Sequence, residues 1–323
     1  MMRKYTFRFA VVILVAFFTA QSVHAATLLI PVGEVIGLQL KDERVTIEAF
    51  DDTLGTAAQA AGLEVGDEIL TIDGKSIHCA EDIRQALKQS DGDVHLQIRR
   101  GRQTRQLELA PSVTKDGPKL GILLKEGITG IGTVTYYDPQ SGCFGALGHG
   151  VNDSNGNFVW MTQGFAYSAQ VDTVQKGRVG EPGQLMGSVT DPEPLAQLSK
   201  NTPQGVFGSG DLLFRGDPLP AASADEIQTG PATIRSTVQN GPAREYSVEI
   251  LKIYPDSGSD GRNLVLRITD PTLLETTGGI VQGMSGSPII QDGKLIGAVT
   301  HVLVNQPDTG YGIFIENMLD AAL

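Results

Sequence analysis

The sequence predicts a mainly β protein of two domains, the larger of which is an antiparallel double β-barrel. Its 323 residues are enough for two domains that each bury a core. The 39 glycines favour many short strands and turns over long helices. The strand signals are split by Gly, Pro and Asn and do not alternate with helices, so a doubly wound parallel sheet does not fit.

Residues 1–25 are expected to be a secretory signal segment outside the fold. A basic start is followed by an apolar run from Phe9 to Ala20 and a small-x-small cleavage site at Val23-His24-Ala25. The run is short for a transmembrane helix, and an uncleaved membrane anchor is the alternative. Removing the segment changes the net charge from −12 to −15. So acidic a protein is not expected to bind nucleic acid or an anionic membrane by charge alone.

Residues 28–111 read as one small domain. The expected elements, in order, are strands at 28–31 and 35–40, a short helix at 57–63, a strand over 65–77 closed by an Asp-Gly turn, a helix at 80–89, and a hairpin of strands at 94–99 and 103–109.

This order, with the motif A-G-L-x-x-G-D-x-I-x-x-I-D-G at residues 61–74, resembles a PDZ domain. PDZ domains bind extended peptides by adding a strand to an exposed sheet edge. The resemblance implies that the carboxylate-binding loop and edge strand are Val35, Ile36, Gly37 and Leu38. A PDZ domain that only packs against its neighbour is the alternative.

Residues 112–119 have the composition of a linker, and a second domain is expected from Leu120 to Leu323. Its clearest strand signals are at 130–137, 158–161, 244–253 and 263–268. The stretch 191–228 is rich in Pro and Gly, and its elements are not assigned from the sequence.

The most informative motif of the second domain places Ser285 between Gly283 and Gly286. These glycines allow a sharp turn that presents a hydroxyl and aims backbone N–H groups at one point, as acyl transfer requires. An apolar run, an Asp-Gly turn and a second strand follow at 288–300. The segment is similar to the nucleophile loop of chymotrypsin-fold serine proteases, whereas a Gly/Ser-rich turn between strands is the alternative.

A serine nucleophile needs a base, and histidine is the usual one. His24 leaves with the signal segment, and His78 and His95 lie in the first domain. Of the two that remain, His149 is framed by glycines, whereas His301 lies inside a strand pattern typical of packed or surface residues. We therefore predict His149 as the base, with His301 as the alternative.

A carboxylate is expected to orient the imidazole. Three aspartates are candidates on spacing alone. Asp270 ends a strand fifteen residues before Ser285, Asp153 lies four residues after His149, and Asp211 lies in a glycine loop. Spacing does not separate them.

The motifs G-A-L-G-H-G, T-D-P and G-G-I-V-Q-G-M-S-G-S-P-I-I, with T-H-V and G-Y-G further on, resemble the stage IV sporulation protein B peptidase family. The resemblance runs from about Leu28 to the C-terminus. It implies the catalytic residues His149, Asp270 and Ser285, an oxyanion hole made by the N–H groups of Gly283 and Ser285, and a substrate-binding edge strand at Thr300, His301 and Val302. Asp270 is closer to the serine than in digestive relatives of the same fold.

The same resemblance implies an exported serine endopeptidase of endospore formation, located between the forespore membranes or at a membrane. Its expected partners are a PDZ ligand peptide and a membrane-anchored regulator. Cleavage of the regulator releases an intramembrane metalloprotease that processes a sigma-factor precursor, and self-cleavage near the N-terminus is also implied.

No cofactor or metal is expected. Cys143 lies six residues before His149, but no second nearby Cys/His pair supplies the spacing of a metal site, so a redox or metal role is only the alternative. A non-catalytic PDZ adaptor on a degenerate protease fold is one rival. An esterase is the other, but the order Ser, Asp, His of α/β-hydrolases is absent.

Overall fold

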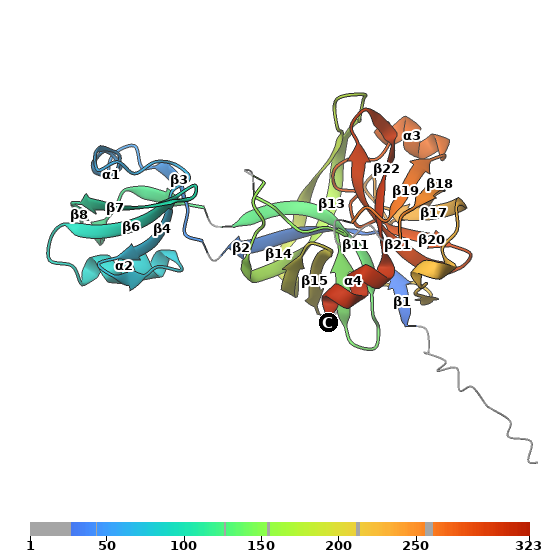
Figure 1. Ribbon diagram of the computed structural model, residues 1–323, viewed down its shortest axis with the longest axis horizontal. Coiled ribbons are helices and arrows are strands. Elements are labelled where there is room, and N and C mark those ends of the chain that lie inside the picture. The colour runs from blue at the N-terminus through green and yellow to red at the C-terminus, as the bar shows by residue number, and fades with distance from the viewer. Residues whose placement is uncertain (1–26, 43, 126, 154–155, 211–213, 256–260) are drawn as a thin grey trace, which may run out of the picture.

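The computed structural model describes residues 27–42, 44–125, 127–153, 156–210, 214–255 and 261–323. The predicted signal segment lies outside the described residues. In the described ranges the chain forms a small domain and two β-barrels, which lie side by side (Figure 1). None of the described helices has the length and apolar character needed to cross a membrane.

The first barrel has six strands and closes where β11 pairs with β12. Apolar side chains from the strands fill its interior, Phe144 and Val134 among them. Two short strands, β1 (Leu28–Pro31) and β16 (Leu219–Pro220), continue the sheet beyond β11. The barrel strands are β2 (Val35–Asp42), β11 (Ile128–Tyr137), β12 (Cys143–Ala146), β13 (Met161–Gln175), β14 (Gln184–Thr202) and β15 (Gly205–Ser209).

The second barrel is also a closed ring of six strands. The C-terminal helix packs against both barrels where they meet. Met318 of that helix packs with Phe207 of the first barrel and Ile313 of the second. The predicted double β-barrel is confirmed. The elements are the 3-10 helix η1 (Ala224–Glu226), strands β17 (Gly230–Ser236), β18 (Arg244–Ile253), β19 (Leu264–Ile268), β20 (Pro288–Gln291), β21 (Lys294–Leu303) and β22 (Gln306–Phe314), and helices α3 (Pro271–Thr277) and α4 (Ile315–Ala322).

The small domain has a four-stranded sheet, two separate strand pairs and two short helices around its own apolar core. Its elements are β3 (Ile47–Phe50), α1 (Thr56–Ala60), β4 (Glu68–Ile72), β5 (Lys75–Ser76), α2 (Ala80–Lys88), β6 (Val94–Arg100), β7 (Gln103–Leu109), β8 (Ser112–Thr114), β9 (Gly117–Lys119) and β10 (Ile122–Leu124).

The small domain is inserted into the first barrel, which corrects the predicted boundaries. Strand β2 leads into it and β11 leads out, and these two strands pair with each other, Leu40 opposite Ile128. Residues 28–42 therefore belong to the barrels and not to the PDZ domain. The predicted linker at 112–119 is the hairpin of β8 and β9, and Ile122 and Leu124 of β10 pack on the core of the small domain.

The predicted peptide-binding segment Val35, Ile36, Gly37 and Leu38 is wrong for the same reason. It lies in β2, which pairs with β11 on one side and with β13 on the other. The side chains of Val35, Ile36 and Leu38 are at most 5% exposed. Because both edges of the strand are already hydrogen-bonded, a ligand peptide cannot add to it.

Candidate active site

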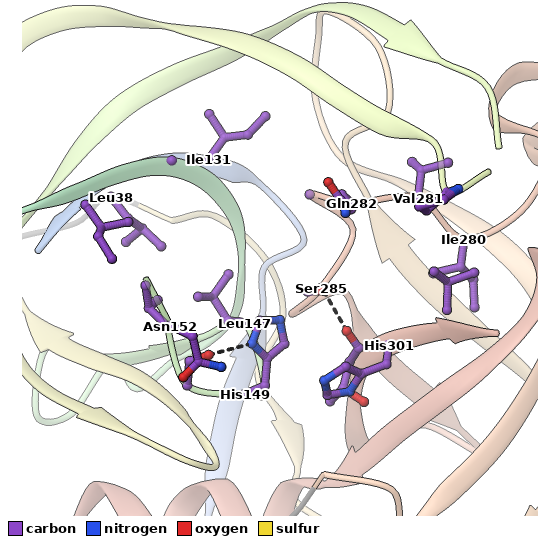
Figure 2. Close-up of a pocket in the computed structure, with 18 of the residues that line it drawn as sticks. Leu38, Ile131, Leu147, His149, Asn152, Ile280, Val281, Gln282, Ser285 and His301 are labelled. Carbon is purple, nitrogen blue, oxygen red and sulfur yellow. Dashed lines mark hydrogen bonds between the residues drawn. The ribbon is translucent and has the colours of Figure 1, made fainter. Parts of the chain in front are cut away.

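A groove with a volume of about 510 Å³ runs between the two barrels and brings together Ser285, His149 and His301. Figure 2 shows the three side chains close together at the centre of the groove. The serine comes from the loop before β20, His149 from the loop after β12, and His301 from β21. Residues that are distant in the sequence therefore meet in one place, where a peptide can reach them.

The serine loop begins where α3 ends. Gly278 terminates the helix in a left-handed conformation, and Gly283 and Gly286 both have a φ of +97°. The loop presents Ser285 half-buried, and its Oγ donates to the carbonyl oxygen of Thr300 at 2.7 Å. The hydroxyl therefore makes no hydrogen bond to His149 in this structure, and hydrogen bonds between catalytic groups are often poorly aligned before substrate binds.

The histidine loop is shaped by two consecutive residues in the left-handed region. Leu147 and Gly148 both have a φ of +69°, which turns the chain so that His149 faces the groove. A Cβ on Gly148 would lie 3.0 Å from Cγ2 of Thr300, so a side chain at this position would push against β21. A non-glycine residue in this conformation, such as Leu147, is strained, and such strain gathers at functional sites.

His149 has the protonation state that a general base needs. Its Nδ1 lies 2.9 Å from the carbonyl oxygen of Gly150. A carbonyl only accepts hydrogen bonds, so Nδ1 carries the proton and Nε2 is left with a lone pair for the serine proton. Burial lowers the pKa of His149 below its usual value, which keeps the imidazole neutral.

This lowered pKa predicts the pH dependence of activity. Only the neutral imidazole accepts the serine proton, and burial disfavours the charged form. We therefore expect the acid limb of kcat/KM to have its midpoint below the ordinary histidine value of about 6.5. Initial rates on a short peptide, measured from about pH 4 to about pH 8, give this midpoint, because that range brackets the ordinary pKa of histidine. A midpoint above the ordinary value would mean that an unrecognised anion stabilises the imidazolium.

Among the described residues, Asp270 makes no hydrogen bond to the imidazole of His149. Asp270 is the N-cap of α3, where its Oδ1 accepts a hydrogen bond from the N–H of Leu273 at 2.9 Å. The Nδ1 atom of His149 that a catalytic carboxylate would bind is taken by Gly150. Of the other candidates, Asp153 accepts hydrogen bonds from Asn157, and Asp211 lies outside the described residues.

Paired substitutions at Asp270 test its role as a cap. Asn caps a helix about as well as Asp, so Asp270→Asn is expected to keep both its stability and its kcat/KM near wild type. Asp270→Ala loses the cap and is expected to cost about 0.5–2 kcal/mol of unfolding free energy. Urea unfolding and peptide hydrolysis measure the two effects. A normally folded Asp270→Asn enzyme that lost about 10⁴-fold in kcat would restore the triad assignment.

The backbone around Ser285 leaves two N–H groups directed to no protein acceptor. These are the N–H groups of Gly283 and Ser285, for which the described part of the chain supplies no hydrogen-bond partner. They are the predicted oxyanion donors. The predicted substrate strand Thr300, His301 and Val302 borders the same groove, and the ring centroid of His301 lies 5.1 Å from that of His149.

The described walls of the groove are mainly apolar, a feature that the sequence does not predict. Among its described lining residues the only titratable side chains are His149 and His301, and none is Asp, Glu, Lys or Arg. The lining positions come from strands and loops of both barrels, so no single local pattern marks them. The apolar walls are formed by Leu38, Leu40, Ile128, Ile131, Leu147 and Val151 on one side and Ile280, Val281, Val302 and Val304 on the other.

Neither cysteine contributes to the groove. Cys79 and Cys143 are both exposed and unbridged. Within the described ranges no three His, Cys, Asp or Glu side chains are grouped so that they could hold a metal ion.

Comparisons with known proteins agree with this architecture. A family model described as SpoIVB peptidase S55 matches residues 116–319, and a PDZ domain model matches residues 54–100. Serine protease HTRA1 of Xenopus tropicalis is 39% identical over 65 residues, which are 20% of this chain and 14% of that protein. The match thus spans about a seventh of the length of that relative.

Two proteases are among the solved structures that resemble this chain at low sequence identity. The Rv3671c protease from M. tuberculosis, in its active form, is 15% identical, with a TM-score of 0.36 over 60% of this chain and 72% of that chain. The HtrA-type protease AlgW with decapeptide is 14% identical, with a TM-score of 0.36 over 65% of this chain and 57% of that chain.

Proposed function

The chain belongs to the SpoIVB peptidase S55 family, and we propose that this serine endopeptidase uses Ser285 as nucleophile and His149 as base on extended, apolar peptide segments. The observation that carries the proposal is the meeting of Ser285 and a neutral His149 in one groove between the barrels.

The proposed reaction gives each of these groups one role. Ser285 Oγ attacks the peptide carbonyl while Nε2 of His149 takes its proton, and the N–H groups of Gly283 and Ser285 stabilise the oxyanion. His149 then gives the proton to the leaving amine. A water molecule, activated by the same imidazole, hydrolyses the acyl-enzyme and frees Ser285.

The proposed biological role is a step in sporulation signalling. The protease is exported across the forespore membrane and cleaves the extracytoplasmic part of a membrane-complex regulator, which leads to processing of a sigma-factor precursor. It also cleaves itself near the N-terminus. The family assignment supports this role. The described lining of the groove contains no Asp, Glu, Lys or Arg, which suits a segment with apolar side chains around the scissile bond.

Mass spectrometry of the purified protein with and without Ser285→Ala tests the function. Wild type should release N-terminal fragments of itself and react stoichiometrically with a fluorophosphonate, whereas Ser285→Ala should do neither. A wild-type protein that is folded but inert to the fluorophosphonate would favour a non-catalytic PDZ adaptor.

Strand β10 of the PDZ domain offers an edge that suits a ligand peptide. Strand β10 pairs with β3 along one edge, and in the described residues its other edge pairs with no strand. Gly121, at a φ of +69°, turns the chain just before it, and Leu123 is 53% exposed. We place the peptide-binding edge at β10.

Removal of the PDZ domain tests whether it delivers substrates. Because β2 and β11 pair up to Leu40 and Ile128, residues 44–125 can be replaced by a short glycine-containing turn that leaves the barrels whole. We expect kcat/KM to fall more for a protein substrate than for a short peptide, because a tethered ligand site raises the effective substrate concentration. Equal losses on both substrates would mean that the domain is structural.

A further inference from the structure

Strands of the first barrel donate hydrogen bonds to the serine loop, the segment 278–287 between α3 and β20. The N–H of Leu185, in β14, donates to the carbonyl of Gln282 at 2.8 Å. Thr133, in β11, makes two contacts: its Oγ1 donates to the carbonyl of Gly283 at 2.7 Å, and its N–H donates to the carbonyl of Ser285 at 3.2 Å. Three carbonyls of the loop are thus fixed by strands of the other barrel.

These contacts set the direction of the oxyanion donors. In a planar trans peptide the C=O and the following N–H point to opposite sides. Holding the Gln282 carbonyl on Leu185 therefore aims the N–H of Gly283 away from β14. Holding the Gly283 carbonyl on Thr133 fixes the next peptide, whose N–H, on Met284, donates to Val281 at 3.1 Å. That peptide is the spacer between the two donor N–H groups.

Thr133 is suited to this task by its burial. Its side chain is 0% exposed, so its hydroxyl has no water to bond and its partner is the Gly283 carbonyl. The carbonyl of Thr133 accepts a hydrogen bond from the N–H of Leu147 at 3.1 Å, in the loop that presents His149. One residue of β11 thus touches both catalytic loops, although it does not line the groove.

We propose that Thr133 is a positioning residue for the oxyanion hole, its hydroxyl holding the Gly283 carbonyl so that the N–H groups of Gly283 and Ser285 converge on the substrate oxygen. This inference rests on the proposed chemistry at Ser285. Loss of the hydroxyl leaves the nucleophile and the base in place and lets the spacer peptide rotate. The oxyanion forms only as the reaction proceeds, so the loss affects kcat and not substrate binding.

Three variants test the proposal. Thr133→Val keeps the shape and removes the hydroxyl, Thr133→Ser keeps the hydroxyl, and Thr135→Val is the matched control. Thr135 is on the same strand and is equally buried, but its Oγ1 has no hydrogen-bond partner among the described residues. Each enzyme is titrated to completion with a fluorophosphonate, and kcat and KM per active site are measured on a short peptide.

We expect Thr133→Val to lower kcat by about 10- to 100-fold with KM nearly unchanged, less than the loss of a whole oxyanion donor. Thr133→Ser and Thr135→Val should retain kcat. A Thr133→Val enzyme with wild-type kcat overturns the proposal, as does an equal loss in Thr133→Ser. If Thr133→Val does not fold, the kcat of a folded Thr133→Ser enzyme tests the proposal. A wild-type kcat supports a positioning role for the hydroxyl, and a loss of about tenfold contradicts it. Failure of wild type to label would instead count against the proposed function.

Discussion

Replacing Ser285 by Ala is expected to reduce peptide hydrolysis by roughly 10⁶-fold, and His149→Ala should cost about as much. The serine supplies the attacking oxygen and the histidine accepts its proton, so either loss stops the same step. Because the two residues act as a unit, the double variant should be little worse than either single one. Peptide hydrolysis followed over several hours, with active-site titration of the wild type, measures these losses.

The fold should survive both substitutions. Ser285 is half-buried and its side chain makes one hydrogen bond, to the Thr300 carbonyl, while His149 is half-buried at the groove. Thermal unfolding monitored by circular dichroism is the control. Easily measured hydrolysis by a folded Ser285→Ala enzyme would remove the serine from its role, and additive losses in the double variant would mean that the two residues do not act together.

The glycine pattern is what made the two catalytic loops visible in the sequence. The motifs around Ser285 and His149 predict unusual backbone conformations at Gly148, Gly283 and Gly286, and all three residues have positive φ values. Short glycine-framed motifs are local signals, because the conformation they require is set within a few residues. The loops were therefore predictable, whereas the contacts between them depend on the packing of distant strands.

The insertion of the PDZ domain could not be predicted from local patterns. The stretch from Val35 reads as a strand whichever sheet it joins, because period and propensity report burial and not partners. Its pairing with β11 joins residues almost ninety positions apart, Leu40 opposite Ile128. The elements of residues 191–228 could not be predicted for a related reason. Pro192 and Pro194 interrupt the strand signal in the sequence, yet both lie in β14.

The role of Asp270 had a local signal that pointed to the structure observed. Asp followed by Pro at the first helical position is a common helix start, and the chain here reads Asp270-Pro271 before α3. The family resemblance instead implies a catalytic role for Asp270. Gly150, whose carbonyl accepts the hydrogen bond of the imidazole, is marked in the sequence only as one of the glycines that frame His149, since a backbone acceptor leaves no signal in the residue types.

Gly286→Ala is expected to be strongly destabilising although it leaves the side chains of Ser285 and His149 in place. A Cβ at this position would lie 2.1 Å from the carbonyl oxygen of Thr133 and 2.5 Å from the N atom of Leu147. Both are backbone atoms that cannot rotate away. The φ of +97° adds strain for any residue with a side chain. We expect a loss of more than about 4 kcal/mol of unfolding free energy, beyond the usual range for a point mutation.

Gly293→Ala is the matched control, because it separates the clash from the strain. Gly293 has a φ of +75° in the turn between β20 and β21, but a Cβ there would meet no atom within 4 Å. It should cost only about 1–2 kcal/mol and leave kcat unchanged. Urea unfolding and active-site titration of both variants measure the difference. Equal stabilities would mean that β11 and the histidine loop can move aside. The two catalytic loops would then not be locked together at Gly286, and any fall in activity would have to arise within the serine loop.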